Sequence, residues 1–372
     1  MTYIRLSRSN FIHLLRWGSA LLVVFNHLRS ILFKDYPLLK HANAFTKFFY
    51  LLTSLGHQAV VIFFVLSGYL VGGSVISEIR KGKFDIKLYA LKRISRLYAV
   101  LLFALVLTIV LDHTGIYFDQ VGLYTDKIKT ATLGFSIANR LSFKYFVTSL
   151  CMMQTIILPP IGSNSPLWSL AYEFWYYVAF PCCSLLLIFI KSKNKYAFLC
   201  AILLILMFTF LPQSIKLSFF IWLIGLIPFY ITLKKPYKFI SLIALPIWLA
   251  LKKVVHIDDF LYDFILALIV AFGISSFENY NQPAKGFFLK ANEKLSSFSY
   301  STYLIHFPII MLILTIIRNY YFIGIWNAPS LIGYLIFISV LVFIFICSYI
   351  VAIFTEYKTP KFRLFLEKLF LR

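Results

Sequence analysis

The chain has 372 residues, of which 61% are hydrophobic and 13% are charged. A soluble domain averages roughly 45–50% apolar and about 25% charged residues, so this composition excludes a soluble globular protein. The 36 Lys and Arg residues against 14 Asp and Glu residues give a formal net charge of +22. In membrane proteins the short cytoplasmic loops collect Lys and Arg, so topology accounts for most of this excess and we expect no nucleic-acid partner.

Apolar runs that are long enough to cross a bilayer recur along the whole chain. A helix needs about 20 apolar residues to cross roughly 30 Å of hydrocarbon. We therefore predict an all-α, polytopic transmembrane helical bundle of about ten spans. The expected spans are residues 12–33, 57–79, 96–111, 168–190, 197–213, 217–233, 238–252, 260–276, 298–318 and 330–355.

Loop charge predicts that the N- and C-termini are cytoplasmic, because basic residues then gather in the inside loops. The apolar stretch 145–160 is the weak point, since an eleventh span there would place most later lysines outside. We favour a re-entrant or interfacial segment. Residues 112–145, with Asp112, Asp119 and Asp126, form the expected extracytoplasmic loop. We assign 1–357 to one membrane domain and 358–372 to a short basic cytoplasmic tail.

The first expected span carries two ionisable residues, Arg16 and His27, in RWGSALLVVFNH. Eleven residues at 100° each return to within about 20° of the same helix face, with a rise of about 16 Å. Arg16 is then expected near the cytoplasmic surface and His27 well inside the bilayer, where a neutral imidazole can accept a proton from a hydroxyl. The alternative is a histidine that only bonds to a neighbouring helix.

In the second expected span, Ser67, Gly68, Gly72 and Gly73 of FFVLSGYLVGG favour close helix packing.

The third expected span begins with KRISRLY, in which Arg93 and Arg96 are three residues apart and share a helix face. Two guanidinium groups there can bind phosphate oxygens as a fork. Ordinary enrichment of basic residues on the cytoplasmic side is the alternative explanation.

The fourth expected span begins with Trp168 and Ser169 and contains Glu173. A carboxylate within hydrocarbon needs a partner, so Glu173 is a candidate to orient His27 or an arginine, or to bind an acceptor hydroxyl. A structural ion pair remains the alternative. We include Trp168 and Ser169 among the substrate-binding candidates, although a tryptophan at a span end also fits an interfacial anchor.

The ninth expected span carries SYSTYLIHFP, which places Tyr300, Tyr303 and His306 on one helix. We include these three residues among the substrate-binding candidates, although polar side chains also hold membrane helices together. The five cysteines lie in apolar surroundings without a C-x-x-C pair. They are typical of small buried residues, so we expect neither a disulfide framework nor a metal site.

Taken together and in this order, these motifs resemble the acyltransferase family 3 membrane proteins, which include bacterial O-acetyltransferases of surface polysaccharides. The resemblance rests on Arg16-x10-His27, FFVLSGYL at 63–70, the R-x-x-R of Arg93 and Arg96, PLWSLAYEFWYYVAFP at 166–181 and SYSTYLIHFP at 299–308. One departure is the Phe-Trp-Tyr-Tyr that follows Glu173, where the family often has Gln-Phe-Tyr.

The resemblance implies transfer of an acyl group, commonly acetyl, from cytoplasmic acetyl-CoA or another acyl-CoA to a hydroxyl of a surface polysaccharide or lipid-linked glycan. It implies a multi-pass protein of the bacterial cytoplasmic membrane. His27 corresponds to the essential histidine of the family, and Arg16, Arg93 and Arg96 correspond to its functional arginines. We predict His27, Glu173 and Arg16 as catalytic residues, and Arg93 and Arg96 as ligands of the acyl-CoA phosphates.

A transporter or flippase of a lipid-linked glycan is the rival function, because it would also need a polar path through a helical bundle. Many transporters contain inverted repeats around a midplane site, and the sequence shows no such repeat.

Overall fold

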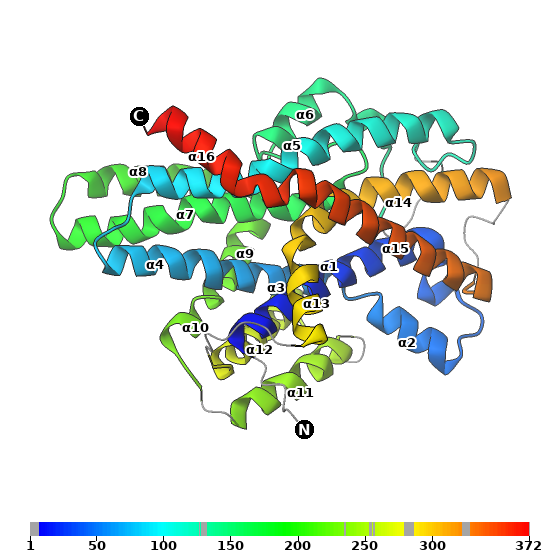
Figure 1. Cartoon of the computed structure of the whole chain (residues 1–372), viewed down its shortest axis with the longest axis horizontal. Coiled ribbons are helices and arrows are strands. Elements are labelled where there is room, and N and C mark those ends of the chain that lie inside the picture. Colours follow the sequence, from blue (N-terminus) through cyan, green and yellow to red (C-terminus); the bar gives the residue numbers. More distant parts are fainter. Residues whose placement is uncertain are drawn as a thin grey trace. The chain divides into compact units, whose positions relative to one another are not determined.

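The chain folds into helices, as the sequence predicts. The computed structural model describes residues 7–125, 127, 132–233, 236–252, 255, 257–278, 286–321 and 328–371, and these contain no strand. Figure 1 shows the course of the chain. The α-helices are α1 (Arg8–Leu32), α2 (Ala44–Leu52), α3 (Gly56–Ser67), α4 (Gly73–Arg80), α5 (Ile86–Phe118), α6 (Phe143–Leu150), α7 (Trp168–Lys191), α8 (Tyr196–Phe210), α9 (Gln213–Ile224), α10 (Ile227–Tyr230), α11 (Pro236–Leu251), α12 (Asp259–Ser276), α13 (Phe287–Ser297), α14 (Ser299–Tyr321), α15 (Leu331–Phe354) and α16 (Thr359–Phe370).

Eight helical segments among the described residues are long and apolar enough to cross a membrane. They coincide with eight of the ten expected spans, and the chain is a multi-pass membrane protein. The fifth and seventh expected spans, 197–213 and 238–252, fall on the shorter apolar helices Tyr196–Phe210 and Phe239–Leu251. At about 1.5 Å per residue these two helices reach only about 20 Å, so the count of ten spans stays a prediction.

The third expected span is longer than the sequence indicated. It begins at Ile86 and continues to Phe118, so Arg93 and Arg96 lie two to three turns inside α5. Asp112 also belongs to this helix and is fully buried, which corrects its assignment to an extracytoplasmic loop. Two hydrogen bonds of 2.7 Å, from the Ser163 backbone N–H and hydroxyl, bind its carboxylate and explain its burial. Asp126 lies outside the described residues.

The chain divides into two compact units, each built from segments that are far apart in the sequence. The first unit takes the described residues of Met1–Trp17, Val60–Arg93 and Ser169–Ser296. The second unit takes those of Gly18–Ala59, Ile94–Trp168 and Ser297–Arg372.

In the first unit, a close helix crossing depends on two glycines. A π-helical turn, η2 (Gly68–Gly72), joins α3 to α4 and packs against α9. A Cβ at Gly68 would lie 1.9 Å from the carbonyl oxygen of Trp222, and a Cβ at Gly225 would lie 2.2 Å from that of Val65. Only glycine fits at these two positions, which confirms the packing role expected for the SGYLVGG segment.

In the second unit, α14 packs along α15, and the 3₁₀ turn η4 (Ser165–Leu167) packs against α14. The stretch 145–160 contains the end of α6, an eight-residue helix of about 12 Å, followed by irregular chain. No spanning helix forms there, in agreement with the expected re-entrant or interfacial segment. The loop that follows is buried at Ile161, Ser163 and Asn164, where protein groups bind its polar atoms.

Candidate active site

The second unit brings together two histidines that the sequence placed on different spans. His27 lies on α1 and His306 on α14, and 2.9 Å separates His27 Nδ1 from His306 Nε2. The ring centroids are 5.1 Å apart and the rings are tilted by 16°. A distance of 2.9 Å between two ring nitrogens is a hydrogen bond, so the two imidazoles form a pair.

The neighbours of this histidine pair fix which nitrogen atoms carry hydrogen. His306 Nδ1 lies 2.8 Å from the carbonyl oxygen of Tyr303 and 3.2 Å from that of Thr302. A carbonyl oxygen can only accept, so His306 Nδ1 carries the hydrogen and the neutral ring presents a lone pair at Nε2. His27 Nδ1 must then donate to that lone pair. The Nε2 atom of neutral His27 consequently carries a lone pair and can act as a base.

The two histidines of the pair differ in burial. His306 is fully buried, whereas His27 is partly exposed. The ring of Phe307 meets His27 edge to face at 5.0 Å, so an apolar wall also holds the imidazole. The buried partner is His306, and the lone pair at Nε2 belongs to His27, the partly exposed residue of the two.

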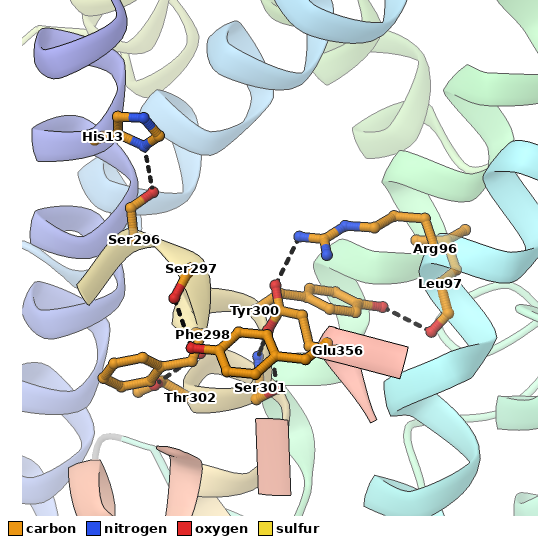
Figure 2. A network of polar contacts seen from close by, with 11 residues as sticks. His13, Arg96, Leu97, Ser296, Ser297, Phe298, Tyr300, Ser301, Thr302 and Glu356 are labelled. Carbon is orange, nitrogen blue, oxygen red and sulfur yellow. Dashed lines mark hydrogen bonds and ion pairs between the residues drawn. The ribbon is translucent and has the colours of Figure 1, made fainter. Parts of the chain in front are cut away.

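A second polar network of the same unit surrounds Arg96 (Figure 2). The Arg96 guanidinium forms an ion pair of 2.8 Å with Glu356 and lies over the ring of Tyr300 at 5.2 Å. The other carboxylate oxygen of Glu356 accepts from the backbone N–H and the hydroxyl of Ser301, at 3.1 Å and 2.9 Å. Glu356 thus binds the first turn of α14, where an anion is favoured, and orients Arg96 at the same time.

In the first unit, Glu173 ends a directed chain of hydrogen bonds. The indole N–H of Trp222 donates to Ser67 Oγ at 3.1 Å, and the Ser67 hydroxyl donates to the Tyr177 hydroxyl at 3.2 Å. The Tyr177 hydroxyl in turn donates to the Glu173 carboxylate. Tyr177 and Trp222 are buried, whereas Glu173 is partly exposed. This series of hydrogen bonds therefore runs from buried donors to a carboxylate that is partly exposed.

Arg93 lies beside this chain. Its guanidinium sits over the rings of Tyr89 and Tyr177, at 5.5 Å and 5.8 Å from their centroids, and the Tyr89 hydroxyl donates to the Tyr177 carbonyl at 3.0 Å. Cation–π contacts of this kind hold an arginine in place without using its N–H groups. Arg93 belongs to the first unit and Arg96 to the second, so the predicted phosphate fork stays a prediction.

The remaining predicted residues have the following positions. Arg16 lies on the same unbroken helix as His27, eleven residues before it, and is partly exposed. Trp168 begins α7 and is partly exposed, whereas Ser169 is buried. The Tyr300 hydroxyl donates to the Leu97 carbonyl at 3.1 Å, and the Tyr303 hydroxyl donates to the Pro166 carbonyl at 3.0 Å. Both tyrosines thus position α14, and substrate contact by any of these residues stays a prediction.

Sequence reasoning missed three contributors to these networks. Tyr177 is four residues after Glu173, a spacing that places both on one helix face and that could have indicated the pair. Glu356 lies one residue beyond the expected last span, where an acidic residue is ordinary and gives no signal. Trp222 gave no signal, because its contact with Ser67 joins positions 155 residues apart.

Comparison with known proteins identifies the family. A model of the acyltransferase family 3, described as an acyltransferase domain, matches residues 9–353. A protein of Haemophilus influenzae, named only as uncharacterized, is 30% identical over 154 residues, which are 41% of this chain and 58% of that protein. The chain therefore covers little more than half the length of that relative. No solved structure matches. Because the family match includes nearly the whole chain and all the networks described above except the link at Glu356, the chain belongs to the acyltransferase family 3.

Proposed function

We propose that this membrane acyltransferase moves an acyl group, acetyl in the first instance, from a cytoplasmic acyl-CoA to a hydroxyl of a surface polysaccharide or lipid-linked glycan. The observation that carries the proposal is the direction of the His27–His306 hydrogen bond, which leaves a lone pair at His27 Nε2. A base of this kind, close to neutral in its ordinary pKa, suits the removal of a proton from a sugar hydroxyl.

In the proposed reaction, the acceptor hydroxyl gives its proton to His27 Nε2 as its oxygen attacks the thioester carbonyl carbon. The carbon–sulfur bond then breaks, and the departing sulfur takes the proton back from His27 Nε2, so the protein ends unchanged. While His27 carries the extra proton, its Nδ1–H continues to donate to His306 Nε2. That bond stabilises the charged ring and keeps its orientation, as the third group of a catalytic triad does.

Arg96 is the proposed contact for a phosphate of the acyl-CoA. A guanidinium has five N–H donors in a plane, a geometry that suits the oxygens of a phosphate. Its side chain is 35% exposed, so a phosphate can reach it. Arg93 and Arg16 stay the other predicted basic contacts, and Glu173 the predicted contact for an acceptor hydroxyl. The bacterial cytoplasmic membrane stays the expected location.

The test is acyl transfer by the purified protein in nanodiscs, with acetyl-CoA labelled in the acetyl group and a membrane extract as the source of acceptors. We expect label in a lipid-linked or polymeric glycan, released by mild base as an ester would be. A flippase would move a lipid-linked glycan across a vesicle membrane and incorporate no label. Label in neither the glycan nor the protein, with acceptor transport intact, would contradict the proposed function.

A further inference from the structure

The C-terminal helix α16 starts close to the end of a membrane-spanning helix. α15 has 24 residues, about 36 Å, which is enough to cross the hydrocarbon layer. Only Thr355 and the short turn η5 (Glu356–Lys358) separate it from α16. Figure 1 shows α16, in red, as the continuation of α15. The first residue of α16 therefore lies close to the end of this expected membrane span.

The sequence of α16, TPKFRLFLEKLF, places five of its six Phe and Leu residues on one side, whereas Leu364 lies on the other side with the basic residues. At 100° per residue, Phe362, Phe365, Leu366, Leu369 and Phe370 fall within an arc of about 140°. The basic side chains Lys361, Arg363 and Lys368 lie on the remaining surface. Much of the apolar arc is uncovered, because Phe365 and Leu369 are each 60% exposed and Phe370 is 62% exposed.

Contacts just before α16 fix where the helix begins. Glu356 is only 5% exposed and bonds both Arg96 and the first turn of α14. The hydroxyls of Tyr357 and Ser297 lie 2.7 Å apart. The start of α14 thus lies beside the end of α15, and α16 begins next to both. These contacts fix the position of the first turn of α16 at the end of that span.

We propose that α16 lies in the headgroup layer of the membrane, with its apolar arc at the acyl-chain boundary and its lysines bound to anionic phospholipid headgroups. An apolar arc of Phe and Leu beside a basic surface is the pattern of interfacial helices. The charge is complementary, since Lys358, Lys361 and Lys368 are exposed and the single acidic residue of α16, Glu367, is bound by Arg363 at 3.3 Å. This proposal does not depend on the proposed acyltransferase reaction.

The test places a nitroxide spin label at two positions on opposite sides of α16, in the full chain with its five cysteines replaced by alanine. Leu369→Cys labels the apolar arc and Glu367→Cys labels the opposite side, about 160° away. Each labelled protein is placed in nanodiscs of phosphatidylcholine, with or without abundant phosphatidylglycerol. Collision with dissolved oxygen, which concentrates in lipid, is compared with collision with a water-soluble nickel chelate.

We expect the label at 369 to collide more with oxygen and the label at 367 to collide more with the chelate. Phosphatidylglycerol should increase this contrast between the two labels. The double variant Lys361→Gln and Lys368→Gln should remove the increase, because each lysine is expected to change the equilibrium for insertion of α16 by roughly fivefold. Equal access of the chelate to both labels in both lipids would overturn the proposal. Protection of the label at 369 from both reagents would also overturn it, because protein or a second copy would then cover the arc.

Discussion

The histidine pair of the second unit and the Glu173 chain of the first unit are both directed runs of hydrogen bonds that begin at buried groups and end at a partly exposed one. They differ in what stands at the end. In the histidine pair the donors point inward, from His27 to His306 to a main-chain carbonyl, so the exposed end is a lone pair. In the Glu173 chain the donors point outward, from Trp222 through Ser67 and Tyr177, so the exposed end is a carboxylate that already accepts a hydrogen.

This difference assigns different chemistry to the two ends. A carboxylate that accepts a hydrogen bond already has one of its lone pairs occupied and is held in one orientation. An imidazole whose other nitrogen donates to an acceptor is held in one tautomer and one orientation, with a lone pair at its second nitrogen. We therefore expect His27 to take the proton and Glu173 to bind or orient a polar group.

The largest expected effect is the loss of the base itself. His27→Ala should lower acyl transfer by roughly 10²–10⁴-fold, which is the usual contribution of a general base. The rate is measured as labelled acetyl incorporated for each folded, membrane-inserted protein. His13→Gln is the matched control, because His13 lies on the same helix and its bonds, 3.0 Å to Ser296 and 3.2 Å to Ser9, involve no residue of the pair. Normal transfer by His27→Ala would remove His27 from the mechanism.

The second prediction concerns His306, the hydrogen-bond acceptor that orients His27. His306→Leu removes the lone pair that receives the His27 Nδ1–H, so we expect a fall of roughly 10–100-fold in kcat. His306→Gln offers a side-chain oxygen in place of that lone pair and should recover part of the rate. Equal activity of His306→Leu and His306→Gln would show that an acceptor at position 306 does not matter, and would contradict the proposed role of His306.

The third prediction tests the Glu173 chain. Tyr177→Phe removes the donor to Glu173 and leaves the Ser67 hydroxyl without its acceptor, at a cost of about 1–3 kcal/mol in the free energy of unfolding. We expect kcat to fall severalfold, less than for either histidine, because Glu173 takes no proton. Tyr172→Phe is the control on the same helix. This variant loses the 2.7 Å hydrogen bond to Ser214 and should lose stability without losing activity. Equal activity of the two variants would contradict a role for the chain.

The lengths of the apolar segments in the sequence predicted most of the fold. Eight of the ten expected spans coincide with long apolar helices because each span needs about 20 apolar residues in sequence, a local property. The Asp112 error has a physical cause. A carboxylate normally ends a hydrophobic span, but here the Ser163 backbone and hydroxyl satisfy it from a loop 51 residues away.

The sequence predicted which residues belong to the candidate site but not which of them contact one another. His27, His306 and Glu173 were singled out because polar groups in apolar spans need a reason. Their partners follow from tertiary packing, which a single sequence does not display. His27 and His306 are 279 positions apart, and no local spacing could have indicated which nitrogen of each ring carries the hydrogen.

The smallest expected effect is at Glu356, where the comparison extends to the binding of the donor. Glu356→Gln keeps an acceptor for Ser301 and removes only the charge that pairs with Arg96. Because Arg96 is partly exposed, we expect a rise of fivefold or less in KM for acyl-CoA, as for a pair worth about 1 kcal/mol or less, with kcat unchanged. Glu367→Gln, which breaks the pair with Arg363 on α16, is the control and should leave KM unchanged. A fall in kcat at constant KM would instead place Glu356 with the histidine pair, in the chemical step, and would remove the distinction between groups that bind the donor and groups that move the proton.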